Sequence, residues 1–249
     1  MKNNQDSNIA MLIDCDNVSS KYIDSILNDL SKYGVVNIRN AYGNWKDHKL
    51  KGWEEALQDH AIKPIQQFDY TKGKNATDIA MIIDVMDLLY TKELSAIALI
   101  TSDSDFTPVV TRILSDGLRV YGYGESKTPD AFVNACSQFI YAEKLYATNS
   151  QKSSEPTTKE SKQRVIERND LRKDTKLVYT LRRAVEQTSD DAGWSNIAAL
   201  GKYISQNSSF SPINYGYLKL GHLIKAIDLF DIKMENNNTV MLIRDKRYW

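Results

Sequence analysis

The fold of this chain is decided by residues 9–17, IAMLIDCDN, where an unbroken apolar run ends in closely spaced acids. Residues 97–105, IALITSDSD, repeat the same design. Apolar runs of four or five residues between polar ones are typical of buried strands in a parallel sheet. In open parallel α/β sheets, ligand sites gather at the carboxyl ends of the strands. The two stretches therefore predict an acidic site at that edge of a parallel sheet.

Around these two stretches, residues 9–148 alternate between strand-like and helix-like patterns. We expect strands near 9–13, 35–41, 61–65, 96–100, 118–122 and 139–141, and helices around 19–32, 48–59, 76–91 and 106–116. Such alternation favours right-handed βαβ units and a mostly parallel sheet, as in an α/β protein.

The next segment marks a domain boundary. Residues 149–163 contain no large apolar side chain, so they cannot bury enough surface to offset the entropy of ordering. We therefore expect a first domain over 1–148, a flexible linker over 149–170 and a second domain over 171–249.

The second domain has the pattern of three helices and a hairpin. Helical spacing covers 175–188, 197–206 (with Ser195 as its N-cap) and 218–229, and two alternating runs, 230–234 and 239–243, flank an Asn-rich connector. This order predicts a small winged helix-turn-helix domain.

Bulk composition describes an ordinary globular chain of 249 residues, 42% apolar and 26% charged. No stretch approaches the roughly 18 apolar residues of a membrane span, and residues 1–7 lack the apolar core of a signal peptide, so we expect a cytoplasmic protein without membrane contact. Residues 1–148 hold 15 basic and 20 acidic residues, a net −5; residues 149–249 hold 17 and 12, a net +5. This asymmetry suits a metal centre joined to a polyanion-binding module, although ordinary surface variation accounts for it equally well.

Three acids form the core of the predicted site. Asp14 and Asp103 each follow a strand, and Asp78 lies at the start of a helix, so all three can meet at the carboxyl edge. Mg²⁺ prefers oxygen ligands and takes one or two carboxylates, completing its shell with water and phosphate oxygens. Asp16 and Asp105 would complete the shell or orient water. Any one of these acids alone is equally explained as a turn residue or a helix cap.

Residues 9–145 resemble the NYN domain, a branch of the PIN-like ribonuclease superfamily with an α/β/α sandwich fold. Three segments carry the resemblance: LIDCDN at 12–17, KNATDIA at 74–80 and TSDSDF at 101–106. The resemblance implies a Mg²⁺- or Mn²⁺-dependent ribonuclease. Its metal-binding acids would be Asp14, Asp78, Asp103 and Asp105, with Asn17 and Ser102 assisting through hydrogen bonds.

Residues 171–245 are similar to the OST-HTH/LOTUS domain, a winged helix associated with RNA-binding proteins. The similar segments are GWS at 193–195, LG at 200–201, YGYLKL at 215–220 and FDI at 230–232. This resemblance implies RNA as the partner. Whether the domain also binds a protein, and whether the chain self-associates, stays open.

Cationic and aromatic side chains are the expected RNA contacts, because single strands are held by basic grooves and by rings on which bases stack. In the first domain Tyr42, Trp45 and Lys46 follow the second strand, and Lys72 and Lys74 precede the acid at 78. In the second domain the expected contacts are Tyr215 and Lys219.

Three functions compete at this point. The first is a metal-dependent ribonuclease that hydrolyses phosphodiester bonds of single-stranded RNA. The second is a non-catalytic RNA-binding or regulatory protein that retains the acids. The third is a phosphatase of the haloacid-dehalogenase type, since Asp14-Cys15-Asp16 mimics its Asp-x-Asp nucleophile motif; that reading leaves Asp78 without a role.

Overall fold

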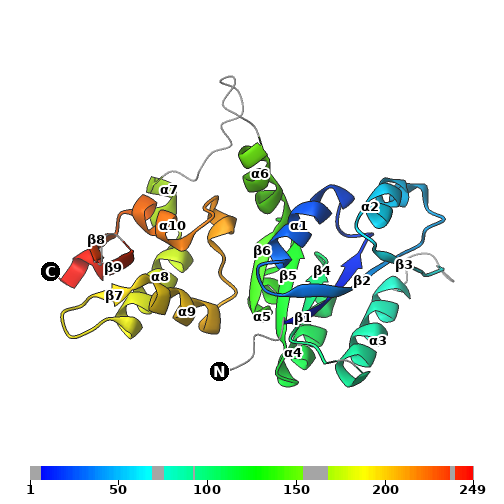
Figure 1. The fold of residues 1–249 in the computed structure, drawn as a ribbon, viewed down its shortest axis with the longest axis horizontal. Coiled ribbons are helices and arrows are strands. Elements are labelled where there is room, and N and C mark those ends of the chain that lie inside the picture. Colours follow the sequence, from blue (N-terminus) through cyan, green and yellow to red (C-terminus); the bar gives the residue numbers. More distant parts are fainter. Residues whose placement is uncertain (1–6, 69–75, 92, 154–167, 236–238, 249) are drawn as a thin grey trace. The chain divides into compact units, whose positions relative to one another are not determined.

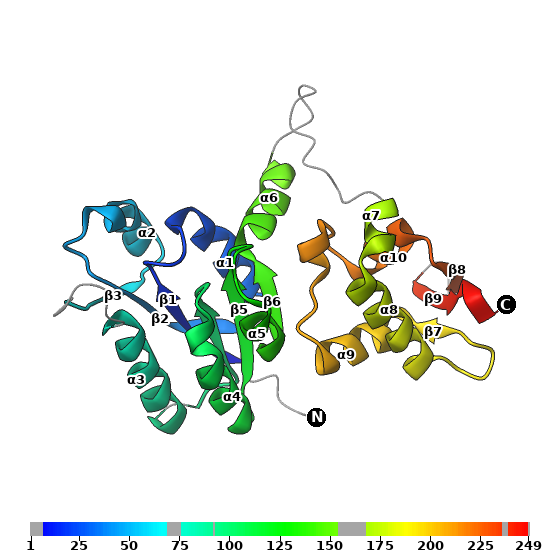
Figure 2. The same cartoon turned by 180° about the vertical axis from the view of Figure 1, so that it is seen from behind.

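The computed structural model describes residues 7–68, 76–91, 93–153, 168–235 and 239–248. The chain divides into two compact units, Met1–Tyr146 and Ala147–Trp249, and each is described by itself. Figures 1 and 2 show the ribbon from opposite sides.

The first unit is built on a six-stranded parallel sheet in the order β3-β2-β1-β4-β5-β6. Its strands are β1 (Asn8–Asp14), β2 (Val35–Gly43), β3 (Lys63–Gln66), β4 (Ala96–Ile100), β5 (Arg119–Gly124) and β6 (Gln138–Tyr141). The chain runs from β1 outward to β3, crosses back through a helix to β4, and then runs to the opposite edge. The order therefore reverses between β1 and β4, which is the switch point of the sheet.

Helices cover both faces of this sheet, giving the three layers visible in Figure 1. One face packs Leu12 and Leu99 against α3 (Ala76–Thr91), α4 (Thr107–Ser115) and α5 (Asp130–Ala135). On the other face lie α1 (Ile23–Leu30) and α6 (Ala142–Ser153). There Tyr123 of β5 donates a 2.9 Å hydrogen bond to the buried Asp29 of α1. The expected PIN-like α/β/α sandwich is confirmed.

Several expected elements differ in detail. The helix expected over 19–32 is a 3-10 turn, Ser20–Tyr22, followed by α1, and the one over 48–59 is a 3-10 stretch, His48–Trp53, followed by α2 (Glu54–Asp59). The expected linker begins and ends in helix, because α6 runs to Ser153 and α7 spans Arg168–Lys173; residues 154–167 lie outside the described part.

The second unit is a winged helix-turn-helix domain, as expected. It contains α8 (Thr175–Thr188), α9 (Ile197–Asn207), α10 (Leu220–Ile227) and a sheet in the order β7-β9-β8. The strands β7 (Ser195–Asn196), β8 (Phe230–Glu235) and β9 (Val240–Asp245) pair antiparallel. Ser195 is not the N-cap of α9: it is paired in β7, and Asn196 caps the helix by accepting from the backbone N–H of Ala198 at 2.8 Å. None of the described helices combines the length and apolarity that a membrane span requires.

Candidate functional site

The switch point between β1 and β4 places two acidic loops side by side. β1 ends at Asp14, and β4 ends one residue before Thr101. The strands pair in register from Ile9 with Ala96 to Ile13 with Ile100, so both loops leave the sheet at the same level. Tyr42 on β2 is the partner of Asp14 on the other side.

Asp14 is the most buried acid of the site, with 1% of its surface exposed. Its Oδ2 accepts from Asn17 Nδ2 at 2.7 Å and from Thr101 Oγ1 at 2.8 Å, and its Oδ1 accepts from the backbone N–H of Asp16 at 3.2 Å. Burial raises the pKa of Asp14, and the hydrogen bonds from Asn17 and Thr101 counteract part of that rise. The carboxylate is therefore held rigidly, in one orientation.

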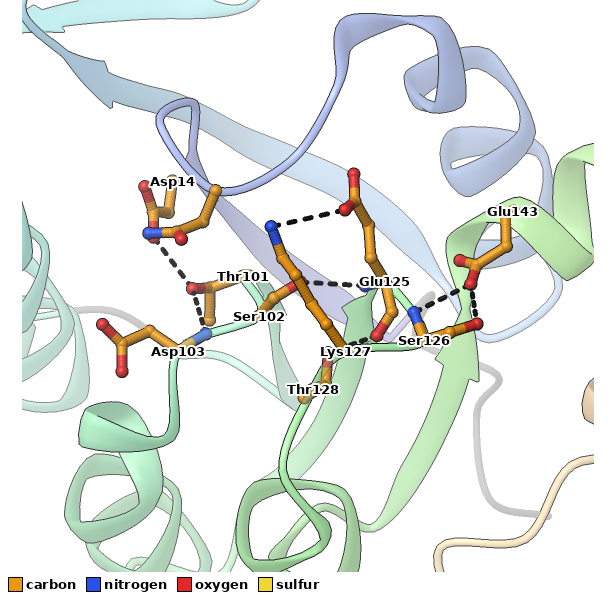
Figure 3. A network of polar contacts seen from close by, with 10 residues as sticks. Asp14, Thr101, Ser102, Asp103, Glu125, Ser126, Lys127, Thr128 and Glu143 are labelled. Atoms are coloured by element: carbon orange, nitrogen blue, oxygen red, sulfur yellow. Dashed lines mark hydrogen bonds and ion pairs between the residues drawn. The ribbon is translucent and has the colours of Figure 1, made fainter.

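Thr101 connects the two strand ends. Its hydroxyl donates to Asp14 and accepts from the backbone N–H of Asp103 at 3.1 Å, as Figure 3 shows. The side chain is fully buried. Sequence reasoning missed this residue, although a hydroxyl directly after an apolar strand, two residues before an acid, is a signal that could have identified it.

Asp103 and Asp105 lie in the loop after β4. Asp103 caps the 3-10 turn Ser104–Phe106, and its Oδ1 accepts from the backbone N–H of Asp105 at 2.9 Å. Asp105 itself is exposed. Ser102 was expected to assist the acids, but its hydroxyl accepts from the backbone N–H of Glu125 at 2.9 Å and so holds the loop that follows β5.

Asp78 lies in the first turn of α3, close enough to the other acids for their charges to act on it. Its pKa is raised to about 6, first by burial and then by the negative charges of Asp14, Asp103, Asp105 and Asp16. The start of α3 also approaches the loop after β1, since Thr77 Oγ1 lies 3.5 Å from Asp16 Oδ2. The site thus has an excess of negative charge on three separate segments.

A divalent cation fits this chemistry. Carboxylate oxygens are the ligands that Mg²⁺ and Mn²⁺ prefer, and a cation would offset the repulsion that raises the pKa of Asp78. Within the described ranges, however, no three His, Cys, Asp or Glu side chains are gathered as a ready-made metal cage. The acids are close enough to influence one another and are not preassembled around a single point.

The loop after β5 adds further polar groups beside the acids. Lys127 Nζ lies 3.4 Å from Glu125 Oε2, and the hydroxyl and backbone N–H of Ser126 donate to Glu143 of α6 (Figure 3). Lys127 is exposed and was not singled out in the sequence.

The aromatic and basic residues predicted to contact RNA in the first domain have different surroundings in the structure. Trp45 and Lys46 line a cavity of about 620 Å³ beyond the carboxyl ends of β2 and β3. Trp45 Nε1 donates to the carbonyl of Ile65 at 3.1 Å, and Lys46 Nζ lies 5.0 Å from the ring centroid of Phe68. Tyr42 is fully buried and donates to Asp84 at 2.6 Å, so it is a core residue and no RNA contact. Lys72 and Lys74 lie outside the described residues.

In the second unit the expected contacts lie around the start of α10. Tyr215 is half-buried and stacks on Phe210, with ring centroids 5.7 Å apart. Lys219 is the exposed N-cap residue of α10.

Two known domain families match this chain. The NYN domain matches residues 8–146, and the OST-HTH/LOTUS domain matches residues 172–241. Among solved structures, the chain is similar to a protein of unknown function from Vibrio parahaemolyticus, with 17% identity and a TM-score of 0.48 over 56% of this chain and 95% of that one. No curated protein matches. The chain belongs to the NYN domain family, and an OST-HTH/LOTUS domain follows its NYN domain.

Proposed function

We propose that this protein is a ribonuclease that requires Mg²⁺ or Mn²⁺ and hydrolyses phosphodiester bonds of single-stranded RNA. The observation that carries the proposal is geometric: at the switch point of an NYN domain the Thr101 hydroxyl bonds both the Asp14 carboxylate and the backbone of Asp103, and Thr77, the neighbour of Asp78, reaches Asp16. The raised pKa of Asp78, due to burial and then to the four other acids, agrees with this convergence. Charge clusters with a purely structural role also shift pKa values. The cluster of acids around Asp78, however, lies at the switch point, where α/β sheets bind ligands.

The way the residues are held supports the following proposed roles. Asp14, Asp78 and Asp103 would hold the metal ion, with Asn17 and Thr101 keeping Asp14 in place. When bound, the ion would polarise a water molecule and offset charge on the phosphodiester. Asp105, the exposed acid of the set, would complete the ion's shell or orient the attacking water.

RNA would reach the acids along the carboxyl edge of the sheet. The cavity beside Trp45 and Lys46 lies past β2, the strand next to β1, and offers an aromatic ring and a cation to a nucleotide. Lys72 and Lys74, which precede α3, remain proposed phosphate contacts. The OST-HTH/LOTUS domain would contribute affinity for RNA.

A second function is favoured by a specific observation. The described acids do not form a ready-made cage, and this arrangement also suits a protein that binds RNA without cleaving it. The two functions differ in whether the protein cleaves the RNA that it binds.

The test is cleavage of an end-labelled single-stranded RNA by the full chain in Mg²⁺, Mn²⁺ or EDTA. We expect cleavage only with a divalent ion, and its loss in Asp14→Asn and Asp103→Asn. Asp87→Asn is the matched control, because Asp87 is an exposed acid near the far end of α3. If the folded wild type binds RNA but cleaves none with either ion, the nuclease proposal fails and the binding function stands. A phosphorylated Asp14 would instead indicate the phosphatase mechanism.

A further inference from the structure

The outward face of α8 in the second unit carries an arginine-rich hollow that the proposed nuclease site does not use. Positions 175, 179, 182, 183 and 186 follow helical spacing along α8, so their side chains share one face, and Arg172 of α7 (Arg168–Lys173) lies beside them in the same cavity. This face and the segment after β9 enclose a cavity of about 510 Å³. Its charged and aromatic lining consists of Arg172, Arg182, Arg183, Arg247, Glu186 and Tyr179, which we call the arginine pocket.

Two of these arginines share a single buried carboxylate. Asp245, 3% exposed, accepts from Arg247 Nε at 3.0 Å and from Arg247 Nη2 at 2.8 Å through its Oδ2. Arg182 Nε lies 3.4 Å from the same oxygen, close enough for an ion pair but without a hydrogen bond. Asp245 therefore offsets only one of these two positive charges. Arg172 is paired with Asp228, which Arg168 and Lys246 share, and Glu186 adds one negative charge to the lining, so the four arginines still leave a positive excess at the pocket wall.

Arg183 and Tyr179 form the outer part of the pocket. Arg183 Nη1 donates to Tyr179 Oη at 3.0 Å, and its guanidinium carbon lies 5.8 Å from the ring centroid. The hydroxyls of Tyr179 and Tyr203 raise the pKa of Arg183, and neutral hydroxyls do not cancel its charge. Tyr179 is 61% exposed, so much of its ring is open to solvent, and the Arg183 guanidinium lies over it.

We propose that the arginine pocket binds the phosphodiester backbone of RNA, with the Tyr179 ring stacking on a neighbouring base. Guanidinium groups match phosphate oxygens with paired donors, and an exposed ring next to them is what distinguishes a nucleic-acid site from a site for acidic peptides. The inference rests on the RNA-binding part of the proposed function. It places a contact on α8, in addition to Tyr215 and Lys219, which stay predictions from the sequence.

The chain offers a control pair of the same two residue types in its first unit, where the arginine is also paired with Asp116. Arg112 Nη2 donates to Tyr90 Oη at 3.0 Å with its guanidinium carbon 5.9 Å from that ring, and Tyr90 is 73% exposed. This pair joins α4 to the end of α3 farthest from the acids, and no sequence or structural observation connects it with RNA. Removing either pair deletes the same two side chains and the same charge.

The experiment is fluorescence anisotropy of a 20-nucleotide single-stranded RNA with the full chain, every protein carrying Asp103→Asn to prevent cleavage. We expect Tyr179→Ala/Arg183→Ala to weaken binding about tenfold and to reduce the salt slope of the dissociation constant by about one. Tyr90→Ala/Arg112→Ala should bind as the parent does. Circular dichroism establishes that each variant is folded.

Three results are decisive. Equal RNA affinity and salt slope for the folded Tyr179→Ala/Arg183→Ala variant and its parent would overturn the proposal. Loss of binding to an oligoglutamate peptide with unchanged RNA binding would also overturn it and assign the pocket to an acidic protein. If the wild type cleaves no RNA but the pocket variant loses RNA affinity, the pocket is supported although the nuclease function fails.

Discussion

At the scale of single residues, Thr101 shows how a small side chain can organise a group of acids. It has one hydroxyl, which donates to Asp14 and accepts from the backbone of Asp103, so it sets the position of one acid relative to the segment that carries another. Because Thr101 is fully buried, water cannot replace either bond.

Replacing Thr101 by valine keeps the shape of the side chain and removes the hydroxyl. We expect RNA cleavage to fall roughly 10–100-fold, as for other residues that orient metal ligands. The free energy of unfolding should fall by about 2 kcal/mol, since a bond to a charged group is lost. Cleavage rates and urea unfolding measure the two effects. Thr111→Val, on exposed α4 surface, is the control; parental cleavage by Thr101→Val would contradict the assigned role.

Asp78 predicts how stability depends on pH. Its pKa is about 6 in the folded protein and near 3.8 in the unfolded chain, so the folded state binds more protons between these values. Stability should therefore decrease as pH rises from about 4 to 6. Asp78→Asn should flatten this dependence, leaving the part due to the raised pKa of Asp14, and should raise the unfolding midpoint at pH 7. Urea unfolding at pH 5 and pH 7 tests it, with Asp87→Asn as the control. If the free energy of unfolding changes equally with pH in the parent and in Asp78→Asn, the assignment of this pH dependence to Asp78 is refuted.

At the scale of elements, the end of β5 is packed directly against the loop that carries Thr101. A Cβ on Gly124 would lie 2.5 Å from the carbonyl oxygen of Thr101 and 2.6 Å from Thr128 Oγ1. The first of these atoms belongs to the backbone and cannot move without displacing the acidic loop. Glycine at 124 thus permits the close approach of β5 and the segment after β4.

Gly124→Ala should therefore lower the free energy of unfolding by about 1–3 kcal/mol and reduce cleavage, because overpacking displaces the loop. Gly52→Ala is the matched control, since its Cβ would meet only Ser20 Oγ at 3.6 Å. Thermal unfolding measures the loss of stability, and a cleavage assay measures the loss of activity. Wild-type values for Gly124→Ala would show that the loop does not need this close contact.

Element types were largely predictable from periodicity, and their ends were not. The apolar runs at 9–13 and 96–100 became β1 and β4 because burial on both sheet faces demands continuous apolar sequence. Ser195 was misassigned because a cap and a short strand look alike in sequence, and only pairing with Ile243 of β9 distinguishes them.

At the scale of the whole molecule, the two units have separate hydrophobic cores, and we propose a separate role for each unit. The cluster around Leu12 and Leu99 belongs to the first unit, and the cluster around Leu181 and Ile224 belongs to the second. Units with their own cores are expected to fold independently.

A chain ending at residue 153 should therefore fold and cleave RNA with an unchanged turnover number and a higher KM, because it lacks the second RNA-binding unit. Circular dichroism and steady-state cleavage kinetics measure this, with the full chain as the reference. A truncated chain that is folded but has lost turnover would show that the OST-HTH/LOTUS domain takes part in the chemistry itself.

By itself, the sequence determined the fold class, the order of the two domains and the acids at the strand ends. Apolar periodicity and the polar residues at strand ends are local properties, so they can be read from the order of residues along the chain. Only the tertiary structure decided which side chains meet: Thr101 joins Asp14 to Asp103, Tyr42 turns inward to Asp84, and the arginines of α8 gather with Arg247 from the far end of the chain. Those contacts depend on which strands and helices pack together, and that is settled by the burial of the whole core.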